Sequence, residues 1–216
     1  MKTGILFDLD GTLLDTLQDL ADAVNYTLRK FGCPERSLEE VRAFVGNGAK
    51  RLIELSLPGT EEDPDLEVAL ACFRAYYGDH AQVKTCPYDG IPEALSVLRE
   101  KYPVAIVSNK PDAAVKILCK QYFKDVYALG EAAGCPRKPA PDMLYKAMQA
   151  IGVEKCIYVG DSDVDVITAG NAGAPCLSVL WGFQDREQIE EAGGTHFCDD
   201  PKLLAKTIEE MITYGK

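Results

Sequence analysis

A short apolar run near the N-terminus ends abruptly in two carboxylates, and this pattern restricts the folds that the chain can adopt. Ile5, Leu6 and Phe7 have the composition of a buried strand, and Asp8 and Asp10 follow just before Gly-Thr. In an open α/β sheet, ligands bind at the carboxyl ends of the strands. Burying two carboxylates there is costly unless a cation or a proton compensates them. The segment therefore predicts a parallel sheet with a chemically active edge, rather than a simple polar turn.

Three later segments also place polar or charged side chains where a predicted strand ends or a helix begins. These side chains are Ser108 and Asn109 after the apolar run 104–107, Lys138 before a predicted helix, and Asp161 and Asp165 after the run 156–159. The carboxyl ends of parallel strands meet at one edge of a sheet. We therefore expect all these groups to lie close to Asp8 and Asp10.

The spacing of apolar residues divides the chain into a helical part and an alternating part. Between 16 and 85 apolar residues recur at intervals of three and four, which indicates helices, and Thr16 is the predicted N-cap of the first. From 86 onward strands and helices alternate, which favours parallel strands with right-handed crossovers. We expect an α/β fold with a doubly wound parallel sheet, in which residues 1–15 and 86–216 form the core and 16–85 form an inserted α-helical cap. The predicted strands are 5–7, 104–107, 126–129, 156–159 and 176–180.

The charge balance narrows the classes of partner. The chain of 216 residues has 34 acidic and 23 basic side chains, for a formal net charge of −11. Nucleic acids and anionic membranes bind basic surfaces, so we expect neither as a partner. An anionic substrate would have to be attracted by local positive groups. With 47% hydrophobic residues, the chain is long enough for one substantial core plus a smaller insertion.

The eight cysteines show no C-x-x-C spacing and do not cluster with His80 or His196, so the pattern typical of a cysteine–histidine metal site is absent. The first residues lead directly into the predicted strand, and Asp8 interrupts any apolar leader, so we expect no secretory signal. No run approaches the length of a membrane span. These features predict a cytoplasmic protein whose cysteines are reduced and mostly buried.

The segment Phe7-Asp8-Leu9-Asp10-Gly11-Thr12-Leu13 resembles the first signature of the haloacid dehalogenase superfamily, most of whose members are magnesium-dependent phosphohydrolases. Ser108, Lys138 and the segment Gly160–Asp165 match the remaining three signatures, in the order that the family shows. The resemblance covers the whole predicted core. It implies hydrolysis of a phosphate monoester through an aspartyl-phosphate intermediate, with Mg²⁺ as the cofactor and a small phosphorylated metabolite as the substrate.

Phosphoryl transfer depends mainly on positioning and on neutralisation of negative charge, and this assigns a role to each candidate. Asp8 is the expected nucleophile. Asp10 would protonate the leaving oxygen and later activate water. Ser108 and Asn109 are the expected contacts to the substrate, and Lys138 would neutralise both Asp8 and the phosphate.

Magnesium prefers hard oxygen ligands in octahedral geometry. Asp8, the backbone carbonyl of Asp10 and Asp161 would supply three of these oxygens, with phosphate and water completing the set. Asp165 lies one helical turn beyond Asp161. We expect it to orient Lys138 or a metal-bound water rather than to bind the metal.

The predicted helical insertion resembles the C1-type cap of the superfamily, which closes over small soluble substrates. Within it, Phe44–Lys50 resembles the substrate loop of phosphoglycolate phosphatases, as do the segments 108–111 and 179–183. Gly46 and Gly48 would let backbone N–H groups approach an anion closely. Lys50 or Arg51 could then meet a substrate carboxylate, although solvated basic residues at a helix start are an equally good interpretation. The preferred substrate on this resemblance is 2-phosphoglycolate.

Several alternatives remain open at this point. Pyrophosphate, sugar phosphates or nucleotides could be the substrate, because related capped enzymes hydrolyse them. A β-phosphoglucomutase-like phosphotransferase shares the aspartate pair and the cap. A non-catalytic binding protein on the same fold is a more remote alternative, because no motif acid is missing.

Dehalogenases and phosphonate-cleaving members lack an acid at the position of Asp10, so the family pattern disfavours both. The oligomeric state is expected to be a monomer or a homodimer.

Overall fold

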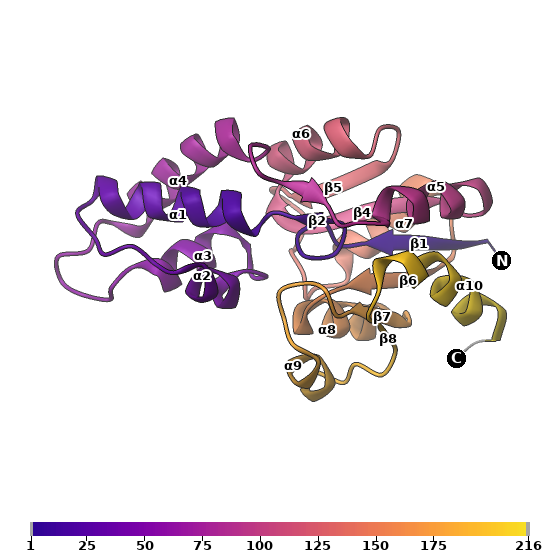
Figure 1. The fold of residues 1–216 in the computed structure, drawn as a ribbon. Coiled ribbons are helices and arrows are strands. Elements are labelled where there is room, and N and C mark those ends of the chain that lie inside the picture. The colour runs from indigo at the N-terminus through magenta and orange to yellow at the C-terminus, as the bar shows by residue number, and fades with distance from the viewer. Residues whose placement is uncertain (1, 215–216) are drawn as a thin grey trace.

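A computed structural model describes residues 2–214 and shows a helical region at one end of the molecule and a layered α/β region at the other (Figure 1). The helical region contains α1 (Leu17–Lys30), α2 (Leu38–Phe44), α3 (Gly48–Ser56) and α4 (Leu66–His80). The remaining helices are α5 (Ile91–Lys101), α6 (Asp112–Tyr122), α7 (Asp142–Ile151), α8 (Asp163–Ala172), α9 (Arg186–Glu191) and α10 (Leu204–Tyr214), the last preceded by a 3-10 turn (Pro201–Leu203).

The central sheet has six parallel strands in the order β5-β4-β1-β6-β7-β8. From the N-terminus they are β1 (Thr3–Phe7), β4 (Val104–Pro111), β5 (Tyr127–Glu131), β6 (Lys155–Gly160), β7 (Cys176–Val179) and β8 (Phe197–Cys198). The chain runs outward from β1 through β4 to β5 and then returns to the other side of β1. The strand order therefore reverses between β1 and β6, and such a switch point is where open α/β sheets bind ligands. The predicted fold class is confirmed.

The side chains of β1 point alternately into two cores, one on each face of the sheet. Ile5 and Phe7 pack with residues of α5, α6 and α10. Leu6 packs on the opposite face with residues of α7 and α8. Because helices cover both faces, four of the five residues of this strand are buried. This explains why its sequence is a continuous apolar run rather than an alternating one.

The four helices of the helical region enclose a third core, to which Leu20, Leu52 and Phe73 contribute. The start of α1 differs from the sequence-based expectation. Thr16 stands at its N-cap but its side chain does not cap the helix. The Thr16 hydroxyl instead donates a hydrogen bond to Asp10 Oδ1 at 2.6 Å. The carboxylate that follows the strand therefore takes the place of a helix cap as the partner of this hydroxyl.

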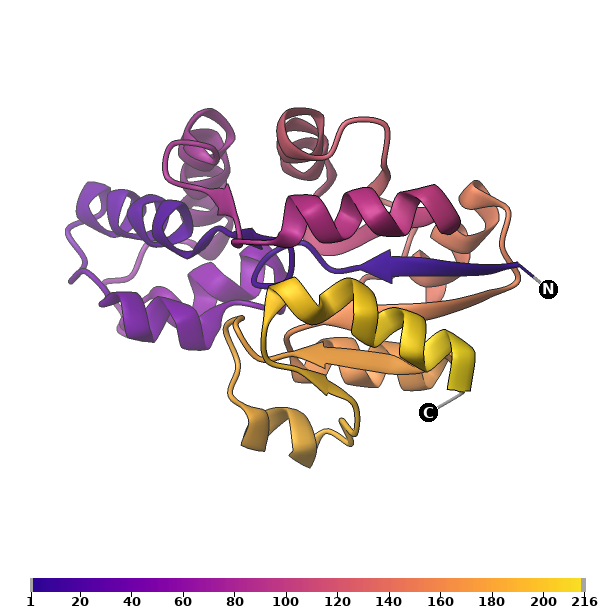
Figure 2. The same ribbon diagram turned by 45° about the vertical axis from the view of Figure 1, so that its right-hand side comes forward.

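The two connections between the helical region and the sheet run side by side (Figure 2). The outgoing connection contains β2 (Leu14–Asp15), which pairs antiparallel with β3 (Cys86–Pro87) of the returning one. Next to this pair, Asp19 of α1 accepts hydrogen bonds from the backbone N–H and the hydroxyl of Thr85, at 2.9 and 2.8 Å. The segments that lead into and out of the helical region are therefore held together by strand pairing and side-chain hydrogen bonds.

None of the eight cysteines, all of which lie in the described part of the chain, forms a disulfide. Fewer of them are buried than the sequence suggested: Cys119, Cys156 and Cys198 are buried, Cys86 is exposed, and the other four are half-buried. Within residues 2–214, no helix combines the length and the apolar character that crossing a membrane requires.

Candidate active site

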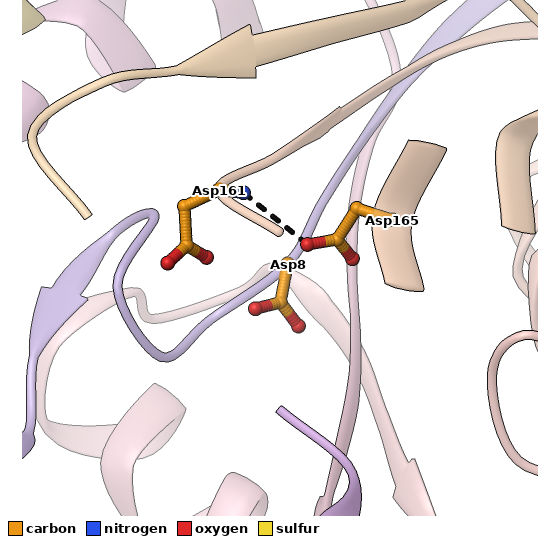
Figure 3. A group of neighbouring side chains, drawn as sticks. All are labelled: Asp8, Asp161 and Asp165. Atoms are coloured by element: carbon orange, nitrogen blue, oxygen red, sulfur yellow. Dashed lines mark hydrogen bonds between the residues drawn. The ribbon is translucent and has the colours of Figure 1, made fainter. Parts of the chain in front are cut away.

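The ends of β1 and β6 bring the carboxylates of Asp8, Asp161 and Asp165 together. One oxygen of each lies within 4.8 Å of the others, and all three residues are buried. Figure 3 shows the three carboxyl groups gathered around one point between the strand ends. Asp8 directly follows β1, and its backbone N–H donates to the carbonyl of Val159 in β6 at 2.8 Å. The site therefore lies at the switch point of the sheet.

Lys138 lies within this group of carboxylates. Its Nζ donates to Asp8 Oδ1 and to Asp165 Oδ1, both at 2.7 Å, and to Tyr158 Oη at 2.9 Å. Burial lowers the pKa of the ammonium group, but the Asp165 and Asp8 carboxylates outweigh this effect and hold the pKa above its ordinary value. Lys138 therefore remains a cation that links the two carboxylates.

The Asp165 carboxylate is fixed on both of its oxygens. Oδ1 accepts from Lys138 and, at 3.0 Å, from the Tyr158 hydroxyl. Oδ2 accepts from the Ser162 hydroxyl at 2.7 Å and from the N–H groups of Asp161 and Ser162 at 3.2 Å. Ser162 and Asp165 form a capping box at the start of α8, which explains this local geometry. Asp165 thus positions Lys138 and the β6–α8 turn.

Burial has the opposite effect on the acids of the cluster. It raises the pKa of Asp8 to about 7 against the lowering effect of Lys138, and the negative charges of Asp165 and Asp10 add to the rise. Burial, followed by the charges of Asp165 and Asp8, also raises the pKa of Asp161 well above its ordinary value. The positive charge near Asp8 and Asp161 is therefore too small to stabilise both carboxylates in their ionised forms.

The composition of the cluster fits a hard divalent cation such as Mg²⁺. Four carboxylates, Asp8, Asp10, Asp161 and Asp165, face only two ammonium groups, which leaves an excess of two negative charges when all are ionised. Asp165 is already paired with the Lys138 ammonium and accepts three hydrogen bonds on its other oxygen, whereas Asp161 accepts one neutral hydrogen bond on each oxygen and has no ammonium partner among the described residues. Asp8 and Asp161 would therefore hold the cation, as carboxylate oxygens are the ligands that Mg²⁺ prefers.

Asp10 is engaged by a residue that the sequence analysis did not select. Lys110 Nζ donates to both carboxylate oxygens of Asp10, at 2.8 and 2.9 Å, and Lys110 is buried. The signal that could have identified it is strand periodicity, because Lys110 lies two positions after Ser108 in β4. Both residues line the same cavity. The sequence-based strand ended too early, at Val107.

A cavity of about 60 Å³ joins the sheet edge to the helical region. The sheet side contributes Asp8, Asp10, Ser108, Asn109, Lys138 and Asp161, and the helical side contributes Leu20, Val45, Gly46, Gly48, Ala49, Leu52, Phe73 and Tyr77. Asn109 ties three segments together at its rim. Its side-chain amide donates to the carbonyls of Gly46 and Lys138, and its side-chain oxygen accepts from the N–H of Lys138 at 2.9 Å. The structure thus brings most of the sequence-predicted site residues to one cavity.

Lys50 is the exception, because the structure has it in the solvated position that was the alternative interpretation of this residue. Its Nζ pairs with Glu67 Oε1 at 2.6 Å on the surface of the helical region, and more than half of the Lys50 side chain is exposed. Arg51 also points to the surface. Ala49 and Leu52 line the cavity instead, because side chains three apart share one face of a helix and α3 turns that face inward. Neither basic residue reaches the cavity in this arrangement.

The loop after β7 supports Asp161 and also contacts the helical region. The N–H of Phe183 donates to Asp161 Oδ2 at 2.8 Å, and Thr12 donates to Oδ1 at 3.0 Å. On its other side, Arg42 of α2 donates to the carbonyls of Phe183 and Gly182, at 2.7 and 3.2 Å. The same loop therefore positions a carboxylate and holds the helical region against the sheet.

The chain resembles hydrolases of one family along most of its length. A family model described as haloacid dehalogenase-like hydrolase matches residues 5–179. The phosphoglycolate phosphatase of Aquifex aeolicus is 35% identical over 215 residues, covering 96% of this chain and 99% of that protein. Phosphoglycolate phosphatase 1 of Pseudomonas aeruginosa is 34% identical over 214 residues, covering 93% and 77%. A crystal structure from Lactobacillus delbrueckii subsp. bulgaricus, of a protein provisionally assigned as a phosphoglycolate phosphatase, matches with a TM-score of 0.87 at 34% identity and covers 96% and 99%.

Proposed function

The chain belongs to the haloacid dehalogenase-like hydrolases, and on this premise we propose that it hydrolyses 2-phosphoglycolate through an aspartyl-phosphate intermediate. One observation carries the mechanism: the carboxylates of Asp8, Asp161 and Asp165 lie close together, and Lys138 pairs with Asp8 and Asp165. The adjoining cavity is also lined by Asp10. The named phosphoglycolate phosphatases among its relatives support the substrate.

Asp8 is placed to act as the nucleophile. Lys138 holds Oδ1, which leaves Oδ2 for attack on phosphorus. In the first step a bond forms between Asp8 and phosphorus, the bond from phosphorus to the leaving oxygen breaks, and Asp10 donates a proton to that oxygen. In the second step Asp10 accepts a proton from the water that attacks phosphorus. Phosphate leaves and the Asp8 carboxylate is restored.

The remaining groups neutralise and orient the phosphoryl group. Ser108 lines the cavity, and its hydroxyl can donate to a phosphoryl oxygen while its oxygen accepts from the N–H of Lys110 at 3.2 Å. Lys138 contributes a fixed positive charge beside Asp8. When bound by Asp8 and Asp161, Mg²⁺ would offset the charge of the carboxylates and of the phosphate. Asp165 keeps Lys138 in place throughout.

We propose that residues 16–85 act as a cap over a core formed by 1–15 and 86–216. The cap supplies the apolar wall of the cavity and excludes bulk water from it. With a volume of about 60 Å³, the cavity has space for roughly four to six waters. This space suits a leaving group of a few heavy atoms better than a hexose.

The test is release of free phosphate, with Mg²⁺ and with a chelator, from 2-phosphoglycolate, pyrophosphate, a hexose phosphate and a nucleoside monophosphate. We expect a strong preference for 2-phosphoglycolate and a requirement for Mg²⁺. Equal rates on all four would remove the named substrate but keep the chemistry. Isomerisation of the hexose phosphate with little free phosphate would instead indicate a phosphotransferase.

The mechanism itself is tested by Asp8→Asn, which should abolish turnover while the fold is kept, because it removes a charge from a repulsive cluster. The matched control is Asp22→Asn, which changes an exposed carboxylate of α1 that pairs with Lys84. Substantial residual phosphatase activity in Asp8→Asn would rule out the aspartyl-phosphate route.

A further inference from the structure

Tyr77 of α4 places an unsatisfied hydroxyl at the cavity. The residue is buried and lines the cavity, and its Oη has no hydrogen-bond partner within residues 2–214. A buried hydroxyl without a partner costs free energy, so a polar group in the cavity is expected to meet it. Burial raises the pKa of Tyr77 to about 12, and the hydroxyl therefore keeps its proton and can donate.

Lys110 lies directly beside this residue. Its Nζ is 4.7 Å from the centre of the Tyr77 ring, while it also donates to both oxygens of Asp10. An ammonium group has three N–H donors, so two contacts to Asp10 leave one for another acceptor, either the neighbouring Tyr77 hydroxyl or a group in the cavity. Among the described residues that line the cavity, only Lys110 and Lys138 are basic. Lys138 is committed to Asp8 and Asp165, which leaves Lys110 as the cation available to a second anionic group.

We infer that Lys110 and Tyr77 form a subsite for the carboxylate of the substrate, next to the ester oxygen that Asp10 protonates. This inference rests on the proposed function and names the residues that select its substrate. In 2-phosphoglycolate the carboxylate carbon is two bonds away from the ester oxygen. A residue that touches Asp10 is therefore within reach of that carboxylate when Asp10 reaches the ester oxygen.

The start of α3 complements the same subsite. Gly48, the first residue of this helix, lines the cavity. The Asn47 side chain does not cap the helix, and its first turn contains no acidic residue. An uncapped helix start carries partial positive charge and free N–H groups. The wall is otherwise apolar, with Leu52 and Phe73, so the subsite should reject a leaving group that carries several hydroxyls.

The experiment compares 2-phosphoglycolate with ethyl phosphate, which has a leaving group of similar length but no carboxylate. The measured quantity is the ratio of kcat/KM for the two esters. Lys110→Met should lower this ratio by about tenfold or more, as expected for loss of a hydrogen bond to a charged group. Tyr77→Phe should lower it severalfold, and Lys110→Arg should restore most of it. Lys101→Met, an exposed lysine of α5 paired with Glu209, is the control and should keep the wild-type ratio.

Tyr77→Phe keeps the test informative if Lys110→Met fails to fold, because it removes only a hydroxyl that has no partner. An equal loss on both esters in Lys110→Met, with an unchanged ratio in Tyr77→Phe, would overturn the subsite and leave Lys110 as a residue that positions Asp10. A wild-type preference for pyrophosphate that Lys110→Met abolishes would keep the anion subsite, but it would replace the proposed carboxylate and substrate. Equal wild-type rates on 2-phosphoglycolate, ethyl phosphate and pyrophosphate would overturn the subsite and the named substrate, while the aspartyl-phosphate chemistry would be kept.

Discussion

Two glycines show how tightly the carboxylates of Asp161 and Asp165 are packed. A Cβ atom on Gly182 would overlap the side chain of Asp161, and one on Gly160 would overlap the side chain of Asp165. Neither glycine has a positive φ, so the requirement is for space and not for an unusual backbone conformation. The strand end and the loop after β7 can approach the two acids only because these positions carry no side chain.

Gly182→Ala should displace Asp161 and weaken binding at the proposed metal site. We expect the Mg²⁺ concentration for half-maximal activity to rise by about tenfold or more, as is typical when a group that orients a ligand is changed. The measurement is phosphate release across a Mg²⁺ titration. Gly170→Ala is the matched control, because nothing lies within 4 Å of a Cβ at this helical position. An unchanged Mg²⁺ dependence in Gly182→Ala would remove Asp161 from the proposed ligands.

The position of Lys50 gives a second test at this scale. Exposed ion pairs contribute little, typically up to about 1 kcal/mol. Lys50→Met should therefore keep the wild-type kcat/KM for 2-phosphoglycolate to within a few fold, since its partner is Glu67 and not the substrate. A loss similar to that of Lys110→Met would mean that α3 rotates to bring Lys50 into the cavity during turnover.

At the scale of elements, strands that exist only by pairing with a segment far away in the sequence could not be predicted from the sequence. The apolar runs of β1, β4 and β6 and the carboxylates after them could be read directly, because a buried strand has a distinctive composition. The two-residue strands β2 and β3 could not, since neither has a periodic pattern and each exists only by pairing with the other. The short elements α9 and β8 were missed as well.

Lys50 and Lys110 show the same limit for functional residues. Lys50 was selected because it follows glycines in a familiar segment, but which face of α3 turns inward depends on packing against the other helices. Lys110 was passed over, although its two-residue spacing from Ser108 is readable in the sequence. Its contact with Tyr77 was not readable, because that residue comes from a helix of the cap.

Arg42 joins two elements and gives a prediction at this scale. Its guanidinium connects α2 to the loop after β7 through the carbonyls of Gly182 and Phe183. Arg42→Met should loosen cap closure, so kcat for 2-phosphoglycolate should fall and KM should rise, each severalfold, since misplacement far from the chemistry is costly. Arg51→Met, an exposed arginine paired with Glu54, is the control. Unchanged kcat and KM in Arg42→Met would show that this contact does not hold the cap closed.

At the scale of the whole molecule, the charge of the site links stability to pH and to metal. The pKa of Asp8 is raised from 3.8 to about 7 in the folded protein, so between these values the folded state binds a proton more strongly than the unfolded chain. The stability from this group is therefore fully present below pH 3.8 and is lost as the pH rises through 7. Burying the ionised carboxylate is the cause.

A divalent cation should reverse this loss. We expect Mg²⁺ to raise the Tm of the wild-type protein more at pH 8 than at pH 5.5, because its carboxylate ligands must be deprotonated. Asp8→Asn should reduce both the Mg²⁺ shift and its pH dependence. The measurement is thermal unfolding at each pH, with Mg²⁺ and with a chelator. A Tm shift that is the same at both pH values and in both proteins would argue against a metal bound by Asp8.

The paired connections β2 and β3 mean that the acids of the site and the helical wall of the cavity lie on separate segments of the chain. Because the two ends of the cap already lie next to each other, a longer, shorter or unrelated insertion could start and finish at the same points without opening a gap in the sheet. The four acids of the site all follow β1 and β6, outside the segment between β2 and β3. Replacing this one continuous segment would change the helical side of the cavity while the acids and Lys110 stay in place.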